Sequence, residues 1–434
     1  MDYFILCTTL LVALFVLLGA GVWVALSLLG VGIIAMEVFG GAPAGPILAT
    51  TAWAASASWT LTALPLFIWM GEILYRTKLS QDMFHGLSPW IRFLPGRLLH
   101  ANVLGCGIFA AVSGSSAATA ATIGRISLPE LKSRGYPDAI SMGSLAGAGT
   151  LGLLIPPSIM MIVYGVAAQV SISRLFIAGL LPGLLLLVIF SGYLMLWSMI
   201  NREQIPADNE RLSFREKIAR ARLLIPVALL IVAVIGSIYA GIATATEAAA
   251  VGVVGALVIA GVSGSLTRET FMASLMGAVC TSCMIFFILL GAHYLTASMS
   301  FTGLPSALAD WIVAKQMSPY VLLFSLTVLF IVLGCFLDGI SIILLTTAII
   351  MPAIQAAGID LLWFGIFVIL VVEMAQITPP VGFNLFVIQG LTGRDLWSVA
   401  RASMPFFFLI ALAMLLITVF PQIVLALPQA VTGQ

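Results

Sequence analysis

Small polar residues in the first half of the chain have the composition of a cation site. The run from Ser113 to Ser116 reads Ser-Gly-Ser-Ser. Glycine permits backbone conformations that other residues disfavour, and serine supplies short hydroxyl groups, so this run can expose several oxygens. A hard cation such as Na+ requires oxygen ligands. The spacing leaves a second interpretation equally open, in which the small residues only allow helices to pack closely.

A similar position in the second half contains a carboxylate. Gly334, Asp338 and Gly339 lie within an otherwise apolar stretch. A charged side chain inside a bilayer costs about 2.5–3.5 kcal/mol on insertion scales, so we interpret Asp338 as part of a second cation site. The competing interpretation is structural, with Asp338 as the N-cap of a helix that starts at Ile340.

Two Pro-Pro pairs mark positions at which hydrophobic helices must break. The pairs begin at Pro156 and Pro379, with Ser158 and Thr378 beside them and Asn384 shortly after the second pair. A broken helix presents carbonyl groups, which favour cations, opposite N–H groups, which favour anions. We therefore predict a cation site next to an anion site in each half.

These patterns assign residues to two kinds of binding site, one for sodium and one for the substrate. Each predicted sodium ligand has an oxygen atom close to a run of small residues or to a helix break. These ligands are Ser113, Gly114, Ser115, Ser116, Pro156, Gly334, Asp338, Gly339, Thr378 and Pro379. The predicted substrate ligands are Ser116, Thr119, Arg125, Ser158, Thr378 and Asn384. No cofactor, no metal other than sodium and no catalytic residue is predicted.

Arg125 has two interpretations. Its guanidinium could face the cavity as a counter-charge for an anionic substrate. It could instead extend along its own apolar stem to the cytoplasmic surface, which is the commoner behaviour of such side chains.

An internal repeat relates the elements that carry these residues. Pro129 recurs as Pro352, and the pair at Pro156 recurs as the pair at Pro379, each 223 residues later. Two similar halves, each with a broken hydrophobic helix, are typical of secondary transporters. Backbone groups freed within the bilayer are tolerated only where protein or a water-filled cavity satisfies them. We therefore expect ions and substrate at the breaks.

The composition indicates a membrane protein. Hydrophobic residues make up 62% and charged residues 8% of the 434 residues, and the mean hydropathy is +1.18. Soluble domains carry about 25% charged residues. Apolar runs of about 20 residues recur along the chain, which predicts an all-α polytopic membrane protein with about ten crossings. The net charge of +1 indicates no nucleic-acid partner.

The distribution of positive charge predicts that the two repeats are inverted. The connector 76–97 is basic, whereas its counterpart 300–320 has Lys315 as its only basic residue. Because basic residues remain cytoplasmic, the two connectors should lie on opposite sides of the membrane, and both termini should be periplasmic. The segments 98–134 and 321–357 are too short for two full spans with a turn, so we predict re-entrant helical hairpins.

The predicted domain organisation has three parts. The first repeat covers 1–200, with a hairpin at 98–134 and a broken helix at 137–169; a cytoplasmic linker covers 201–222; the second repeat covers 223–434, with a hairpin at 321–357 and a broken helix at 360–390. The linker carries six basic and four acidic residues, and this basic excess places it in the cytoplasm.

In these motifs and their order, the chain resembles the large membrane subunit of the tripartite ATP-independent periplasmic (TRAP) transporters. The resemblance runs from about Leu64 to Pro405. Its most specific parts are Ser113–Ser116, the stretch 155–160 around the first Pro-Pro pair, and the stretch 377–386 around the second. Together these motifs are very specific, although each is weak alone.

The resemblance implies Na+-coupled uptake of a small organic acid, such as a C4-dicarboxylate or a sugar acid, across a bacterial inner membrane. It implies an elevator mechanism, in which the hairpins and broken helices slide past a scaffold. It also implies two partners, a separate small four-helix membrane subunit and a periplasmic substrate-binding protein. The chain departs from the family at Ala245 and Leu361, where proline is usual, and at Arg125, where a small residue is usual.

The sequence leaves one other class of protein open and argues against two more. The nearest alternative is a stand-alone anion/Na+ symporter of similar hairpin design that needs no binding protein. An intramembrane serine protease based on Ser115 is disfavoured, because the chain has three histidines and no Gly-x-Ser-x-Gly sequence. An ATP-driven pump is excluded by the absence of a Walker A sequence.

Overall fold

The computed structural model of the chain describes residues 3–206, 213–334, 337–380 and 382–432. Within these ranges the chain is built of helices and contains no strand, so the predicted all-α fold is confirmed. The predicted linker 201–222 is described only in part, since 207–212 lie outside the described residues. The same holds for 335–336 in the predicted second hairpin and 381 in the predicted second broken helix.

The helices follow one another with short connections. Along the first part of the chain they are α1 (Tyr3–Gly19), α2 (Val24–Ile34), α3 (Ala44–Ser56), α4 (Ala63–Arg76), α5 (Leu79–Ile91), α6 (His100–Ser113), α7 (Ser116–Ser133), α8 (Asp138–Leu154), α9 (Ile159–Ala167) and α10 (Ile172–Ile200). The later ones are α11 (Phe214–Ala221), α12 (Ile225–Tyr239), α13 (Ala245–Val262), α14 (Arg268–Thr302), α15 (Leu304–Ala314), α16 (Pro319–Gly334), α17 (Gly339–Ala356), α18 (Leu361–Gln376), α19 (Phe383–Thr392), α20 (Leu396–Val419) and α21 (Gln422–Thr432).

Several helices have the length and composition of membrane spans. Among the described residues, five are long and apolar enough to cross a bilayer, and eight are if each bent pair counts as one span. Shorter apolar helices such as α16 and α18 fall below the length of a full crossing. The count of about ten crossings stays a prediction.

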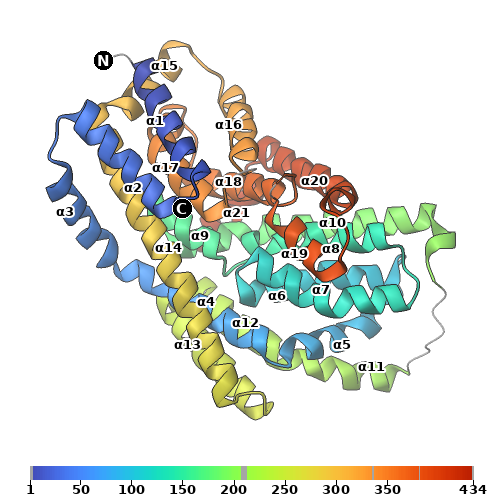
Figure 1. Ribbon diagram of the computed structural model, residues 1–434. Coiled ribbons are helices and arrows are strands. Elements are labelled where there is room, and N and C mark those ends of the chain that lie inside the picture. Colours follow the sequence, from blue (N-terminus) through green and yellow to red (C-terminus); the bar gives the residue numbers. More distant parts are fainter. Residues whose placement is uncertain (1–2, 207–212, 335–336, 381, 433–434) are drawn as a thin grey trace.

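The helices form two groups that lie side by side (Figure 1). In one group the long helix α14 packs along α2, α3 and α4, and α13 packs between α4 and α12. In the other group α8 lies at the centre and contacts α6, α7, α10, α18, α19 and α20. This second group contains most of the predicted site residues.

The helix boundaries follow the repeat seen in the sequence. The helices α17 and α18 begin 223 residues after α7 and α8, and α19 begins within one residue of the same displacement from α9. The proline inside α10, Pro182, likewise corresponds to Pro405 inside α20. The two parts of the chain therefore fold into the same order of elements.

The two predicted hairpins differ in how their arms pack. The helices α6 and α7 lie against each other and against α8, whereas α16 packs mainly on α18 and α17 packs mainly on α15, α14 and α9. The first pair is rich in Ala, Gly and Ser, which allow helices to approach closely, while α16 and α17 are rich in Leu, Ile and Phe. The larger side chains of α16 and α17 instead fill the spaces next to other helices.

Both Pro-Pro pairs break a helix, as predicted. The helices α8 and α9 meet at an angle of 43° across residues 155–158, and α18 is separated from α19 by 377–382. Proline lacks the backbone N–H and clashes with the preceding turn, so neither α8 nor α18 can continue. After the first break, Ser158 caps the new helix by accepting a hydrogen bond from the Met161 N–H.

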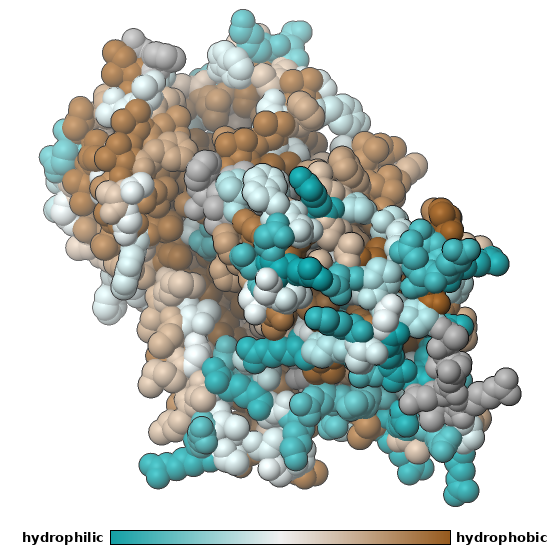
Figure 2. Space-filling view, turned by 45° about the vertical axis from the view of Figure 1, so that its right-hand side comes forward, coloured by the Kyte–Doolittle hydropathy of each residue, from teal (hydrophilic) through white to brown (hydrophobic). Residues whose placement is uncertain are grey.

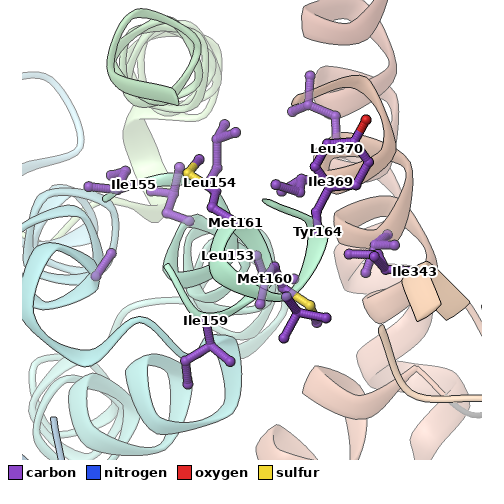
Figure 3. Close-up of a cluster of buried hydrophobic side chains, with 14 of the residues drawn as sticks. Leu153, Leu154, Ile155, Ile159, Met160, Met161, Tyr164, Ile343, Ile369 and Leu370 are labelled. Atoms are coloured by element: carbon purple, nitrogen blue, oxygen red, sulfur yellow. The ribbon is translucent and has the colours of Figure 1, made fainter. Parts of the chain in front are cut away.

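The first break lies inside the core that the two halves share. Figure 3 shows Leu153, Leu154, Met160 and Met161, on either side of that break, in one cluster of buried side chains with Ile343 of α17 and Ile369 of α18. All six side chains are buried. Closely packed apolar side chains stabilise a fold through their many van der Waals contacts. This cluster therefore holds the first broken helix against the second half of the chain.

The surface separates into hydrophilic and hydrophobic regions. Figure 2 shows hydrophilic side chains gathered over the lower and right-hand part of the view, and hydrophobic side chains over much of the upper left. Large apolar side chains are exposed on the helices of the α14 group, including Val232 of α12, Val254 of α13 and Met276 of α14. Exposed apolar surface of this extent is typical of helices that contact lipid or partner helices.

Candidate ion and substrate site

The tip of the first hairpin fits against the first helix break. Gly114 connects α6 to α7 in the left-handed backbone region (φ +61°), and its carbonyl accepts a hydrogen bond from the Ile159 N–H at 3.2 Å. A Cβ atom at Gly114 would lie 2.8 Å from the Pro157 carbonyl oxygen. Glycine is therefore required both by the backbone conformation and by the contact.

The hydroxyl groups around this tip have local partners. Ser115 caps α7 by accepting a hydrogen bond from the Ala118 N–H at 3.4 Å, and the Ser113 hydroxyl lies 2.7 Å from the Thr119 hydroxyl. Ser113 and Thr119 are buried, and Ser115 is half-buried. The tip thus concentrates hydroxyl and carbonyl oxygens next to the first break.

One hydrogen bond joins the first hairpin to the second broken helix. The Ser116 hydroxyl donates to Asn384 Oδ1 at 2.6 Å, although the two residues are 268 positions apart. The Asn384 amide in turn donates to the Ala146 carbonyl of α8 at 3.4 Å. Both side chains are buried, at 3% and 0% exposure. Three elements therefore meet at one buried polar contact.

Glycines of α8 make this meeting possible. A Cβ atom at Gly152 would lie 2.6 Å from the Ser115 carbonyl oxygen and 2.8 Å from the Thr119 hydroxyl. A Cβ atom at Gly149 would lie 2.8 Å from the Ala120 Cβ. Sequence reasoning assigned no role to either glycine. The available signal was the short spacing of glycines along one helix, which indicates close backbone approach.

The first break contributes buried polar groups of its own. Ser158 is fully buried, and its hydroxyl donates to the Leu153 carbonyl across the break. Pro156 is buried beside it. The Ser158 hydroxyl therefore stabilises the break as a hydrogen-bond donor and the first turn of α9 as an N-cap acceptor.

The second tip is built differently. The Asp338 carboxylate accepts hydrogen bonds from the N–H groups of Ile340 (3.1 Å) and Ser341 (3.4 Å) and is exposed. This is the geometry of a helix N-cap, which was the structural interpretation of Asp338. A role in binding sodium stays a prediction.

The glycines beside Asp338 contact both broken helices. A Cβ atom at Gly339 would lie 2.5 Å from Met160 of α9 and 2.5 Å from Val372 of α18. A Cβ atom at Gly334 would lie 2.3 Å from the Ala375 Cβ. A cavity of about 60 Å³ lies between this tip and α18, with Asp338 and Gln376 among its lining residues.

Thr378 and Pro379 lie at the second break and are half-buried. The Thr378 hydroxyl donates to the Met374 carbonyl at 2.7 Å, so it replaces a helical partner that the break removes. A Cβ atom at Gly382 would lie 2.8 Å from the Thr378 carbonyl oxygen, which keeps this loop narrow.

Arg125 lies away from these residues. It is exposed on α7, and its guanidinium carbon is 5.6 Å from the ring centroid of Tyr75 in α4. Nine residues separate it from Ser116, which is about 13 Å along a helix axis. The structure thus brings together the tip residues, the break residues and Asn384, but places Arg125 on the surface between α7 and α4.

The described residues contain no group of three or more His, Cys, Asp or Glu side chains that could hold a metal ion. A cation at these tips would therefore depend on hydroxyl and carbonyl oxygens, with Asp338 as the one carboxylate predicted among the ligands. Alkali cations accept such neutral ligands.

Comparison with known proteins decides the family. The model of the family described as "Tripartite ATP-independent periplasmic transporter, DctM component" matches residues 11–423. The chain belongs to this family. It is accordingly a multi-pass membrane component of a TRAP transporter and not an enzyme.

Individual relatives agree with this assignment. The DctM-family chain is 35% identical to the C4-dicarboxylate TRAP transporter large permease protein DctM of Pseudomonas aeruginosa, over 88% of this chain and 89% of that protein. It is 30% identical to the sialic acid TRAP transporter large permease protein SiaM of Vibrio cholerae, over 87% and 88%.

Among solved structures, the YdaH transporter of Alcanivorax borkumensis has a similar fold. Its crystal structure matches with a TM-score of 0.64 at 14% identity, covering 93% of this chain and 96% of that one. At this identity the similarity concerns the fold alone.

Proposed function

We propose that this DctM-family chain imports a small organic acid by coupling its movement to a sodium gradient. The observation that carries the proposal is the fit of the Gly114 tip against the first break. There the Ile159 N–H binds the Gly114 carbonyl, and Gly152 of α8 lies against the Ser115 carbonyl. Oxygens held this rigidly can replace the hydration shell of a cation.

The substrate would bind beside this cation. The Ser116–Asn384 pair lies within the same contact, and Ser158 begins α9, whose N-terminal N–H groups favour an anion. The similarity to the Pseudomonas aeruginosa and Vibrio cholerae proteins supports a carboxylate substrate, since their names specify C4-dicarboxylates and sialic acid.

Transport would follow an elevator mechanism within two inverted repeats. The helices of the α8 group would move as a unit past the α14 group, with α4 as part of the scaffold. A Cβ atom at Gly71 of α4 would lie 2.9 Å from the Ser113 carbonyl, so this interface allows close approach of the two groups. The predicted partners are a small four-helix membrane subunit and a periplasmic binding protein that delivers the substrate.

The test is uptake by proteoliposomes that contain the chain and its small subunit, with purified binding protein outside. Radiolabelled succinate and sialic acid serve as probes. We expect uptake only with an inward Na+ gradient and only with the binding protein present. Uptake without the binding protein would favour the stand-alone symporter, and uptake that is equal in K+ would contradict sodium coupling.

A further inference from the structure

A carboxylic acid is buried in the second broken helix without a partner. Glu373 of α18 has 0% exposure, and neither of its carboxyl oxygens has a hydrogen-bond partner among the described residues. Thr150 of α8 faces the carboxyl, but its hydroxyl donates to the Gly147 carbonyl at 2.8 Å. Glu373 lies one helical turn before the break at 377–382.

The burial of Glu373 determines its charge. An ionised carboxylate without a counter-charge or hydrogen bonds is far too unfavourable in such surroundings, so the group takes up a proton instead. Even the neutral acid leaves polar atoms unsatisfied, which costs about 1–3 kcal/mol. A leucine or methionine would avoid this cost, so packing alone does not explain an acid at this position.

In the described part of the chain, no charged group balances a negative charge on the Glu373 carboxyl. The helices that pack against α18 bring the following titratable or charged side chains: Asp138 (α8), Tyr164 (α9), Arg174 and Tyr193 (α10), Tyr320 (α16), Asp338 (before α17) and Arg401 (α20). In the described part of the chain none of them forms an ion pair or hydrogen bond with Glu373. Asp138 instead pairs with Arg394, and the Tyr164 hydroxyl donates to the Leu361 carbonyl at the far end of α18.

A small cavity lies beside the turn of α18 that carries Glu373. The cavity of about 60 Å³ at the second tip is lined by Val372, Ala375 and Gln376, which flank Glu373 on α18, and by the exposed Asp338. Gln376 Oε1 is also buried and has no hydrogen-bond partner within the described residues. A cavity of this volume with polar atoms at its wall can hold water, which transfers protons.

We propose that Glu373 is a proton-binding site, which carries its proton in the buried arrangement seen here and exchanges it during the transport cycle. The proton is then a second coupled ion, next to sodium. The role in coupling rests on the proposed transport function, whereas proton binding itself does not.

Infrared difference spectroscopy on the purified full-length chain tests the site without any substrate. A pH increase should remove a protonated-carboxyl band that is absent from Glu373→Gln, an isosteric neutral variant. Glu72→Gln is the matched control, because Glu72 is a partly exposed acid paired with Arg76 at 3.0 Å, and it should retain the band. A wild-type band that persists at every pH, or no band that Glu373→Gln removes, would overturn the proposal.

Uptake into proteoliposomes tests the coupling. At a fixed Na+ gradient, wild-type uptake should increase as the external pH falls, by at most about tenfold per pH unit, the limit for one proton. Glu373→Gln should make uptake independent of pH. A wild-type pH profile in Glu373→Gln would overturn the coupling. If the infrared band titrates but the wild type shows no Na+-driven uptake, the proton site stands and the proposed transport function fails.

Discussion

The hydrogen bond between Ser116 and Asn384 provides a quantitative test of how the two halves are joined. Among the described residues Ser116 is the one donor to Asn384 Oδ1, so Ser116→Ala removes this hydrogen bond, and both residues are buried. A buried acceptor left unsatisfied costs about 1–3 kcal/mol, more than the 0.5–1.5 kcal/mol that a hydrogen bond contributes on average. We therefore expect Ser116→Ala to destabilise the chain by about 1–3 kcal/mol.

The assay is unfolding of the detergent-purified chain, followed by intrinsic fluorescence. Ser325→Ala is the matched control, because the Ser325 hydroxyl is exposed and donates only within α16, to the Val321 carbonyl. This variant should stay within about 0.5 kcal/mol of the wild type. A double-mutant cycle with Asn384→Ala should give a coupling of about 0.5–3 kcal/mol. Equal stabilities of Ser116→Ala and Ser325→Ala, or a coupling of zero, would refute this reasoning.

The remaining predictions concern the ion, the substrate and the topology. Ser115→Ala and Asp338→Asn should each raise the Na+ concentration for half-maximal uptake while folding stays nearly intact; unchanged Na+ dependence would mark that residue as structural. Because Arg125 lies on the surface away from the tips, Arg125→Gln should leave the uptake of an anionic probe unchanged; a loss of about 1–3 kcal/mol, with partial recovery in Arg125→Lys, would instead place the residue at the substrate. A cysteine at Gln81 should react with an impermeant thiol reagent only from the cytoplasm, and one at Ser306 only from the periplasm; labelling of both from one side would contradict inversion.

The sequence predicted those parts of the fold that depend on local chemistry. The prolines at 156 and 379 break their helices wherever those helices lie, because the missing N–H is a property of the residue itself. Asp338 caps α17, which was the competing interpretation of this residue, whereas the capping of α9 by Ser158 was not predicted although a short polar side chain favours it. The apolar composition likewise predicted an all-helical membrane protein.

Contacts between distant segments could not be predicted in the same way. Nothing in the local sequence indicates that Ser116 bonds to Asn384, or that Arg125 lies over Tyr75, because both contacts depend on how helices pack. The difference between the two hairpins has the same origin. The repeat predicted one hairpin in each half, but the large side chains of α16 and α17 pack mainly against other helices.

Glu373 shows a further limit. The printed sequence shows an acid among apolar residues, but whether a partner lies near it depends on how α8 packs against α18, and among the described residues its carboxyl oxygens have no hydrogen-bond partner.

The central claim is that the hairpin tips and broken helices bind sodium, and the stability of the purified chain tests it most directly. Thermal unfolding is measured while NaCl replaces KCl at constant ionic strength. A ligand that binds only the folded state stabilises it by RT ln(1 + [L]/Kd), about 2.7 kcal/mol at one hundred times Kd. We predict stabilisation of the wild type by Na+ and a smaller effect in Ser115→Ala. Equal unfolding temperatures in NaCl and KCl would contradict the claim.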